Sequence, residues 1–306
     1  MYYYRYEETV FASLLPDLPL ETADRPAAGT PGLFLIDRDP VSGRSSFCVS
    51  DARQLTARTE DVSWLDPSRM GVPIPALPKR VQHTIDARLL RAVNIRHPRW
   101  RDFARLPDKQ PSGRRRVNLL AVGDVGGTLL TALKLLGGDC IERIGICDLN
   151  QKAVSRWAAE MGQVSWPWDY DALPEVEPVS DEDLFRCDVF LFAATRGVPP
   201  VGGGVRDVRM AQFSANRPLV EQYALQARQA GFRGLFIVLS DPVDPLCKAA
   251  YLASNQGEDG QWDGLGLRAE QIQGFGLGVM NARAAYYAKQ DPRFRSFLTD
   301  GRSYGP

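Results

Sequence analysis

Residues 119–130 read Leu-Leu-Ala-Val-Gly-Asp-Val-Gly-Gly-Thr-Leu-Leu, and this segment is the strongest indication of the fold class. An apolar run that enters a glycine-rich turn and then resumes predicts a strand, a tight turn and a helix in immediate succession. Apolar runs and amphipathic segments keep alternating through the second half of the chain. This alternation is typical of an α/β fold, in which helices cover both faces of a doubly wound parallel sheet.

The alternation predicts the elements of this part of the chain. The expected strands cover residues 117–122, 143–147, 189–193, 234–239 and 271–274. The expected helices begin near Gly127, Gln151, Met210, Pro245 and Asn281, and the third of them runs to Ala230.

Residues 1–113 differ from the rest of the chain in composition and pattern: they contain many prolines and arginines, and turn residues interrupt their short apolar runs. The β-prone runs 33–37 and 46–50 flank a turn sequence, which predicts a hairpin. Residues 81–105 carry apolar side chains at near-helical spacing, which predicts an amphipathic helix that Pro98 ends. We therefore expect a small α+β module before the parallel sheet.

Two prolines and a glycine within residues 107–113 predict a linker, because they cannot sustain regular structure. The expected organisation is an N-terminal module over residues 1–113, a second domain over residues 114–290 and a C-terminal tail over residues 291–306.

The composition narrows the possible partners. The chain has 37 basic and 37 acidic side chains, so no global field attracts nucleic acid or an anionic membrane. The sequence has neither a signal-peptide pattern at its start nor an apolar run long enough for a membrane helix. We therefore expect a cytoplasmic protein. Its five scattered cysteines and two histidines lack the spacing of a disulfide framework or a metal site.

The turn after the first strand of the second domain holds Gly123 and Gly126, while Ala121 stands where a dinucleotide fingerprint has its first glycine. Glycines here let a pyrophosphate approach the amides at a helix N-terminus, where the helix dipole favours its charge. Asp148 ends the next strand, where a carboxylate binds ribose hydroxyls and repels a 2′-phosphate. The pattern predicts NAD as the cofactor; the alternative is that Asp148 only caps a helix.

Three further segments narrow the class. Arg209 follows a glycine- and proline-rich loop and precedes Asn216 by seven residues. Residues 236–244 read Phe-Ile-Val-Leu-Ser-Asp-Pro-Val-Asp, and residues 272–283 read Ile-Gln-Gly-Phe-Gly-Leu-Gly-Val-Met-Asn-Ala-Arg. In this order, they resemble the substrate loop, the Asn-Pro-Val-Asp strand end and the Ile-Gly-x-Gly-Thr-x-Leu-Asp-Ser-Ala-Arg segment of lactate and malate dehydrogenases. The resemblance covers just over half of the chain and implies a Rossmann-type sheet.

The resemblance also implies a role for each matching residue. Arg209 would polarise a substrate carbonyl, Arg283 would grip a carboxylate, and Asp241 takes the place of the asparagine that bonds the substrate oxygen. The residues that would bind the dinucleotide are Gly123, Val125, Gly126, Asp148 and Ala194. The implied ligands are NAD and a small carboxylate substrate, and the implied assembly is a homodimer.

The sequence departs from the pattern of these dehydrogenases at residues that would take part in proton transfer and substrate binding. Met280 replaces the aspartate that orients the catalytic histidine, and a thioether can neither orient an imidazole nor stabilise its charge. No histidine follows His97, whereas the family's histidine lies beyond the matched segment. Asp241 would repel a carboxylate substrate. We therefore expect the usual 2-hydroxy acid dehydrogenase reaction to be lost or altered.

Three functions are compatible with the sequence. The first is an NAD-binding pseudoenzyme with a nucleotide-binding or regulatory role. The second is an active NAD-dependent oxidoreductase whose acid comes from the N-terminal module, from His83, His97 or a tyrosine of residues 2–4. The third is a protein-interaction module that keeps a Rossmann scaffold without a nucleotide.

Overall fold

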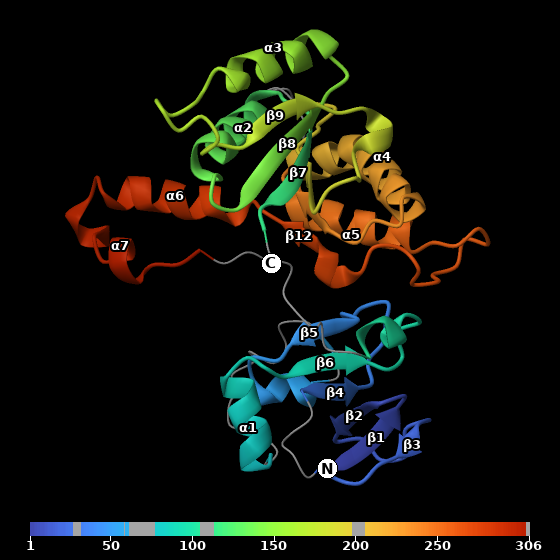
Figure 1. The fold of residues 1–306 in the computed structure, drawn as a ribbon. Helices are drawn as coiled ribbons and strands as arrows, with labels where there is room; N and C mark the ends of the chain where they lie inside the picture. The colour runs from blue at the N-terminus through green and yellow to red at the C-terminus, as the bar shows by residue number, and fades with distance from the viewer. Residues whose placement is uncertain (27–31, 58, 61–76, 105–112, 198–205, 304–306) are drawn as a thin grey trace. The chain divides into compact units, whose positions relative to one another are not determined.

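The computed structural model describes residues 1–26, 32–57, 59–60, 77–104, 113–197 and 206–303. The chain forms two compact units (Figure 1). The first contains Met1–Ser112 and Asn255–Glu270, and the second contains Gly113–Ser254 and Gln271–Pro306. The sequence pattern divides the chain differently at two places, because it leaves residues 255–270 inside the second domain and treats residues 291–306 as a separate tail.

The second unit is built on a six-stranded sheet in the order β12-β11-β10-β7-β8-β9 (Figure 1). Its strands are β7 Arg115–Leu120, β8 Ile141–Cys147, β9 Glu175–Pro178, β10 Val189–Phe192, β11 Leu235–Val238 and β12 Ile272–Gly274. Every pair of neighbours is parallel. Numbered along the chain and read from β9, the strands follow the order of a doubly wound Rossmann fold. The predicted α/β class is confirmed.

Helices cover both faces of this sheet. They are α2 Asp124–Leu136, α3 Gln151–Gly162, α4 Val208–Gln229, α5 Val243–Ser254, α6 Leu277–Ala288 and α7 Phe297–Asp300. Helices α2 and α3 lie on one side and α4 and α5 on the other, while α6 and α7 extend away from the sheet (Figure 1). The expected helices are present, although α2 and α6 begin a few residues earlier than predicted. The sequence pattern did not predict the edge strand β9, because its residues, Glu-Val-Glu-Pro, lack the apolar run typical of a buried strand.

Two apolar layers hold the second unit together, one on each face of the sheet. On the side of α2 and α3, buried side chains of the strands pack against the helices; they include Val117, Leu119, Ile144, Ile146, Leu130 and Val154. The other face carries aromatic packing, in which the rings of Phe190 and Phe236 lie 4.9 Å apart. These layers fix the strand ends that carry the candidate site.

The first unit contains a second six-stranded sheet, in the order β3-β1-β2-β4-β6-β5. Its strands are β1 Tyr2–Tyr6, β2 Thr9–Ser13, β3 Glu21–Thr22, β4 Leu33–Ile36, β5 Ser46–Cys48 and β6 Arg91–Asn94, and its longest described helix is α1 Lys79–Asp86. The predicted hairpin is wrong: β4 pairs with β6 in parallel and β5 pairs with β6 antiparallel. A strand that is distant in sequence separates them, which local turn signals cannot reveal.

The predicted helix over residues 81–105 is also wrong after its first turns. Helix α1 ends at Asp86, and Arg88 adopts a φ of 59°, a left-handed conformation that does not continue a right-handed helix. Ala92 and Val93 are then both buried in β6. A short helix followed by a buried strand can give the same apolar spacing as one longer helix. Because α1 already ends at Asp86 and β6 follows it, Pro98 does not end a helix as predicted.

Two sequence features fall outside the described residues, namely most of the expected linker at 107–113 and the glycine-rich loop at 202–204. Among the helices that the structure describes, none is both long and apolar enough to span a lipid bilayer.

The start of α2 lies directly on the end of β7. A Cβ atom on Gly126 would lie 1.9 Å from the carbonyl oxygen of Ala121, and one on Gly127 would lie 2.4 Å from the ring of Trp157. Both positions therefore require glycine for close packing. Ala121 itself has a φ of 73°, in the left-handed region where glycine has no steric penalty.

Replacing Gly126 with alanine should destabilise the protein by about 2–3 kcal/mol, because backbone must move to admit the methyl group. The matched control is Gly162→Ala at the end of α3, where a Cβ atom has no described neighbour within 4 Å. Urea denaturation of both variants would test this, and equal stability of the two would contradict it.

Candidate functional site

The candidate site lies at one edge of the second unit's sheet. Strand β10 pairs in parallel with both β7 and β11, so the three carboxyl ends meet at the edge where ligands bind in doubly wound folds. The chain continues from β7 into Gly123, from β10 into Ala194 and from β11 into Asp241. Residues far apart in the sequence are therefore neighbours in the fold.

Gly123 is the N-cap of α2, and no side chain of the described residues caps this helix start. A Cβ atom on Gly123 would have no described atom within 4 Å. The start of α2 is therefore uncapped and has free space at Gly123, and an uncapped helix N-terminus is suited to bind phosphate. Asp124 follows and is exposed, and its carboxylate opposes an anion at this place.

Asp148 braces the same turn from the end of β8. One carboxylate oxygen accepts a hydrogen bond from the Val122 amide at 2.9 Å, and the other accepts one from the Asn150 amide at 2.8 Å. Asp148 does not cap α3, because the N-cap of that helix is Asn150, whose side chain accepts a hydrogen bond from the Ala153 amide at 3.3 Å. The alternative prediction of a helix-capping aspartate is therefore wrong, although Asp148 does hold the backbone of the turn. Each carboxylate oxygen has two lone pairs, so the half-buried Asp148 can still accept hydrogen bonds from a ligand.

The other two residues expected at the dinucleotide differ in their accessibility. Val125, in the first turn of α2, is 61% exposed, whereas Ala194, directly after β10, is 9% exposed. The carbonyl of Ala194 accepts a hydrogen bond from the Ser240 hydroxyl at 2.6 Å. Val125 is thus open to a ligand, and Ala194 joins the ends of β10 and β11.

Arg209 and Asp241 form an ion pair, with 2.8 Å between Nη1 and Oδ2. The two side chains come from α4 and from the end of β11, and both are more than half exposed. The sequence marked both residues as catalytic candidates but did not predict that they would meet. The two opposite charges therefore offset each other, while the predicted roles of Arg209 and Asp241 toward a substrate stay predictions.

Asn216 is a buried polar residue that the sequence treated only as a landmark. Its Oδ1 accepts hydrogen bonds from the Arg196 amide at 2.8 Å and from the Thr195 hydroxyl at 3.2 Å. Its Nδ2 donates to the carbonyl of Asp241 at 2.9 Å. Asn216 thus fixes the backbone after β10 and β11 relative to α4, which positions Arg209 and Asp241.

Arg283 does not join this pair through any hydrogen bond or ion pair within the described residues. It is exposed on α6, three residues after the half-exposed Met280. The glycines before this helix have a packing role, because a Cβ atom on Gly274 would lie 2.3 Å from Val243. The family-like glycines therefore serve the contact between β12 and α5, while the position of Arg283 as a substrate contact stays a prediction.

His97, a candidate acid of the first unit, is 2% exposed. Its Nδ1 accepts a hydrogen bond from the Arg99 amide at 3.1 Å, and its ring packs edge-on against Trp262. Burial lowers the pKa of His97 to about 4, and the charges of Arg99 and Arg268 act in the same direction. This imidazole is neutral near pH 7 and serves the core of its unit. His83, the other candidate, is exposed on α1.

Comparison with known proteins finds sequence similarity over part of the chain only. No family model matches the chain. It is 26% identical over 146 residues to L-lactate dehydrogenase 1 of Lactobacillus acidophilus, which covers 47% of this chain and 42% of that protein. It is 26% identical over 141 residues to L-lactate dehydrogenase of Treponema denticola, covering 46% and 42%. The chain thus matches less than half the length of these curated relatives.

Solved structures give likenesses of the same kind. A minor L-lactate dehydrogenase of Enterococcus mundtii has a TM-score of 0.45 and 20% identity, covering 59% of this chain and 52% of that one. The malate dehydrogenase of Picrophilus torridus has a TM-score of 0.45 and 20% identity, covering 58% and 50%. Each of these structures covers somewhat more than half of this chain, and the two curated L-lactate dehydrogenases cover slightly less than half.

The buried His97 predicts a pH-dependent stability. The folded pKa is about 4 and the unfolded pKa is 6.5. The unfolded chain therefore takes up a proton first, and the free energy of unfolding should fall by about 3 kcal/mol as the pH drops through this window. Urea denaturation at several pH values would measure the slope. His97→Asn keeps an acceptor for the Arg99 amide and should flatten the slope, whereas His83→Asn should not; equal slopes would contradict the account.

Proposed function

We propose that the second unit binds NAD or NADH at the Gly123 turn, and that its substrate side does not carry out the usual 2-hydroxy acid dehydrogenase reaction. The protein then acts through nucleotide binding, in a sensing or regulatory role. The similarity to lactate and malate dehydrogenases supports the choice of cofactor, and the departures at Asp241 and Met280 support the altered chemistry.

The observation that carries the proposal is the open face of Gly123. The glycines that follow it serve internal packing, since a Cβ atom on either would overlap protein atoms, but a Cβ atom on Gly123 would meet none of the described atoms. Packing against described atoms does not require glycine at this position, and the same holds for Gly162. Gly123 differs from Gly162 in its place at the uncapped start of α2, beside Asp148. A residue without a side chain there leaves the approach of a pyrophosphate to the first amides of α2 clear.

Different residues around the Gly123 turn would bind different parts of the dinucleotide. The amides of α2 would hold the pyrophosphate, and the free lone pairs of Asp148 would accept hydrogen bonds from ribose hydroxyls. A carboxylate at that place repels a 2′-phosphate, which favours NAD over NADP. Bound NAD supplies the hydride-accepting ring of a dehydrogenase. Ala194 and Asp241 follow the strand ends over which the nicotinamide half lies in this fold, and Asn216 of α4 holds the backbone there.

The substrate side has a different charge arrangement from that of a 2-keto acid site. An unpaired Arg209 would stabilise negative charge on a carbonyl oxygen, but Asp241 lies within 2.8 Å of it. A small carboxylate substrate would have to displace Asp241 while being repelled by it. Met280, half-exposed at the start of α6, provides no acid or base for a proton transfer.

Nicotinamide fluorescence and calorimetry on the full chain test the proposal. The wild-type protein should bind NADH, and Gly123→Val should weaken binding at least about tenfold, because the branched side chain occupies the space of the pyrophosphate. Its unfolding midpoint should hardly change. Gly162→Val is the matched control at another open glycine. Wild-type protein that binds neither NAD nor NADH would refute the proposal and favour an interaction module without a nucleotide.

Asp148→Asn tests the recognition of the ribose. The variant removes the charge that repels a 2′-phosphate, so the preference for NADH over NADPH should fall at least about tenfold. It also keeps only one of the two oxygens that accept backbone amides, so some loss of stability is expected. Competition between the two nucleotides measures this preference directly. A lower stability with an unchanged preference would mean that Asp148 only braces the turn.

Asp241→Asn tests the substrate side. Removing the carboxylate frees Arg209, so NADH-saturated protein should bind oxamate about five- to tenfold more tightly than wild type. The double variant Asp241→Asn with Arg209→Ala should lose this gain. Fluorescence titration of the NADH complex gives the affinities, and wild-type protein that binds oxamate as tightly as Asp241→Asn would contradict the proposed block.

A further inference from the structure

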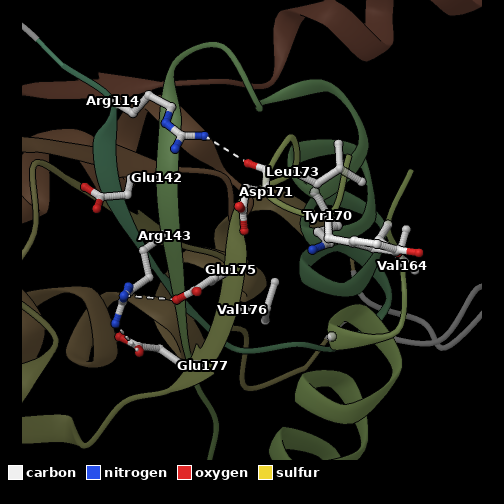
Figure 2. Close-up of a pocket in the computed structure, with 13 residues that line it drawn as sticks. Arg114, Glu142, Arg143, Val164, Tyr170, Asp171, Leu173, Glu175, Val176 and Glu177 are labelled. Atoms are coloured by element: carbon white, nitrogen blue, oxygen red, sulfur yellow. Dashed lines mark hydrogen bonds and ion pairs between the residues drawn. The ribbon is translucent and has the colours of Figure 1, made fainter. Parts of the chain in front are cut away.

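A second cavity lies in the second unit, at the sheet edge opposite the Gly123 turn. It has a volume of about 600 Å³ and is lined by the beginnings of β8 and β9 and the ends of α2 and α3 (Figure 2). We call it the β8–β9 pocket. Because parallel strands begin at one edge of a sheet and end at the other, it is separate from the proposed dinucleotide site.

The β8–β9 pocket holds charges of both signs. Arg143 lies 3.0 Å from both Glu175 and Glu177, so these charges already satisfy one another. The remaining charged lining residues are two bases, Arg114 and Lys134, and two acids, Glu142 and Asp171. Neither an anion nor a cation alone complements these two basic and two acidic side chains. A neutral ligand that both donates and accepts hydrogen bonds complements all four.

Lys134 is a buried lining residue of the pocket that can still donate hydrogen bonds to a ligand. Its side chain is buried, and its ammonium donates a hydrogen bond to the carbonyl of Pro174 at 2.8 Å. Burial lowers the pKa of Lys134. An ammonium has three N–H groups, so this one contact leaves donor capacity beside the cavity.

An exposed aromatic turn adjoins the pocket. Residues 165–171 read Ser-Trp-Pro-Trp-Asp-Tyr-Asp, and Trp166, Trp168 and Tyr170 are 51%, 91% and 70% exposed. Exposed aromatic side chains close together are uncommon on surfaces without a binding role. Tyr170 also lines the pocket, and in Figure 2 it lies with Val164 on the side opposite Arg114 and Arg143.

We propose that the β8–β9 pocket binds a carbohydrate. Sugar hydroxyls donate and accept hydrogen bonds equally well, which matches a lining where Arg114 and Lys134 donate while Asp171 and Glu142 accept. The less polar face of a sugar ring packs on aromatic side chains, and Tyr170, an exposed lining residue, offers one at the side of the pocket. Trp168, in the same turn, offers a platform for a second ring of an oligosaccharide. This inference does not depend on the proposed binding of NAD.

Tryptophan fluorescence and calorimetry on the full chain, titrated with maltotriose, cellotriose and chitotriose, test the proposal. We expect at least one of the three to bind, with an affinity that Tyr170→Ala and Asp171→Asn each lower at least tenfold and that added sodium chloride hardly changes. Tyr286→Ala, which removes a similarly exposed tyrosine on α6, should bind like wild type. Circular dichroism melting of each variant verifies folding.

The other outcomes would overturn the proposal. These are no binding of any of the three sugars, binding that Tyr170→Ala and Asp171→Asn leave unchanged, or binding only of spermidine or glutamate that salt abolishes. The last result would make the pocket a site for simple ions. NADH titrated in the same experiments keeps the two sites distinguishable, since Tyr170→Ala should leave NADH affinity unchanged.

Discussion

Close contact between the start of α2 and the end of β7 is the constraint on which the second unit depends. Gly126 has no room for a side chain beside the carbonyl of Ala121, so the helix begins almost on the strand. Gly123 starts this helix without a side-chain cap, and Asp148 holds the turn before it through the Val122 amide. These two residues carry the proposed dinucleotide site.

The charge arrangement at this edge separates the protein from the dehydrogenases it resembles. Asn216 ties the backbone after β10 and β11 to α4, so the scaffold that presents Arg209 is intact. Within that scaffold, Asp241 pairs with Arg209. Since both side chains are more than half exposed, the pair contributes at most about 1 kcal/mol to stability. Under the proposed function, the pair matters for charge, because Asp241 offsets the positive charge of Arg209 where a substrate carbonyl would lie.

Sequence patterns predicted the second unit well and the first unit poorly, for physical reasons. Strand, glycine turn and helix follow one another locally around Gly123, and helix starts such as Gln151 carry their own signals. In the first unit, β6 separates β4 from β5, a long-range pairing that turn residues cannot encode. The ion pair between Arg209 and Asp241 was missed for the same reason, although each residue was marked singly. The β8–β9 pocket leaves no motif, because its lining comes from several elements.

Hydrogen–deuterium exchange with and without NADH would locate the nucleotide on the chain without any substitution. We expect slower exchange of the amides in residues 122–128 and 148–151 when NADH is present, and unchanged exchange in residues 164–176, which surround the β8–β9 pocket. Unchanged exchange at the Gly123 turn in the presence of saturating NADH would contradict this expectation.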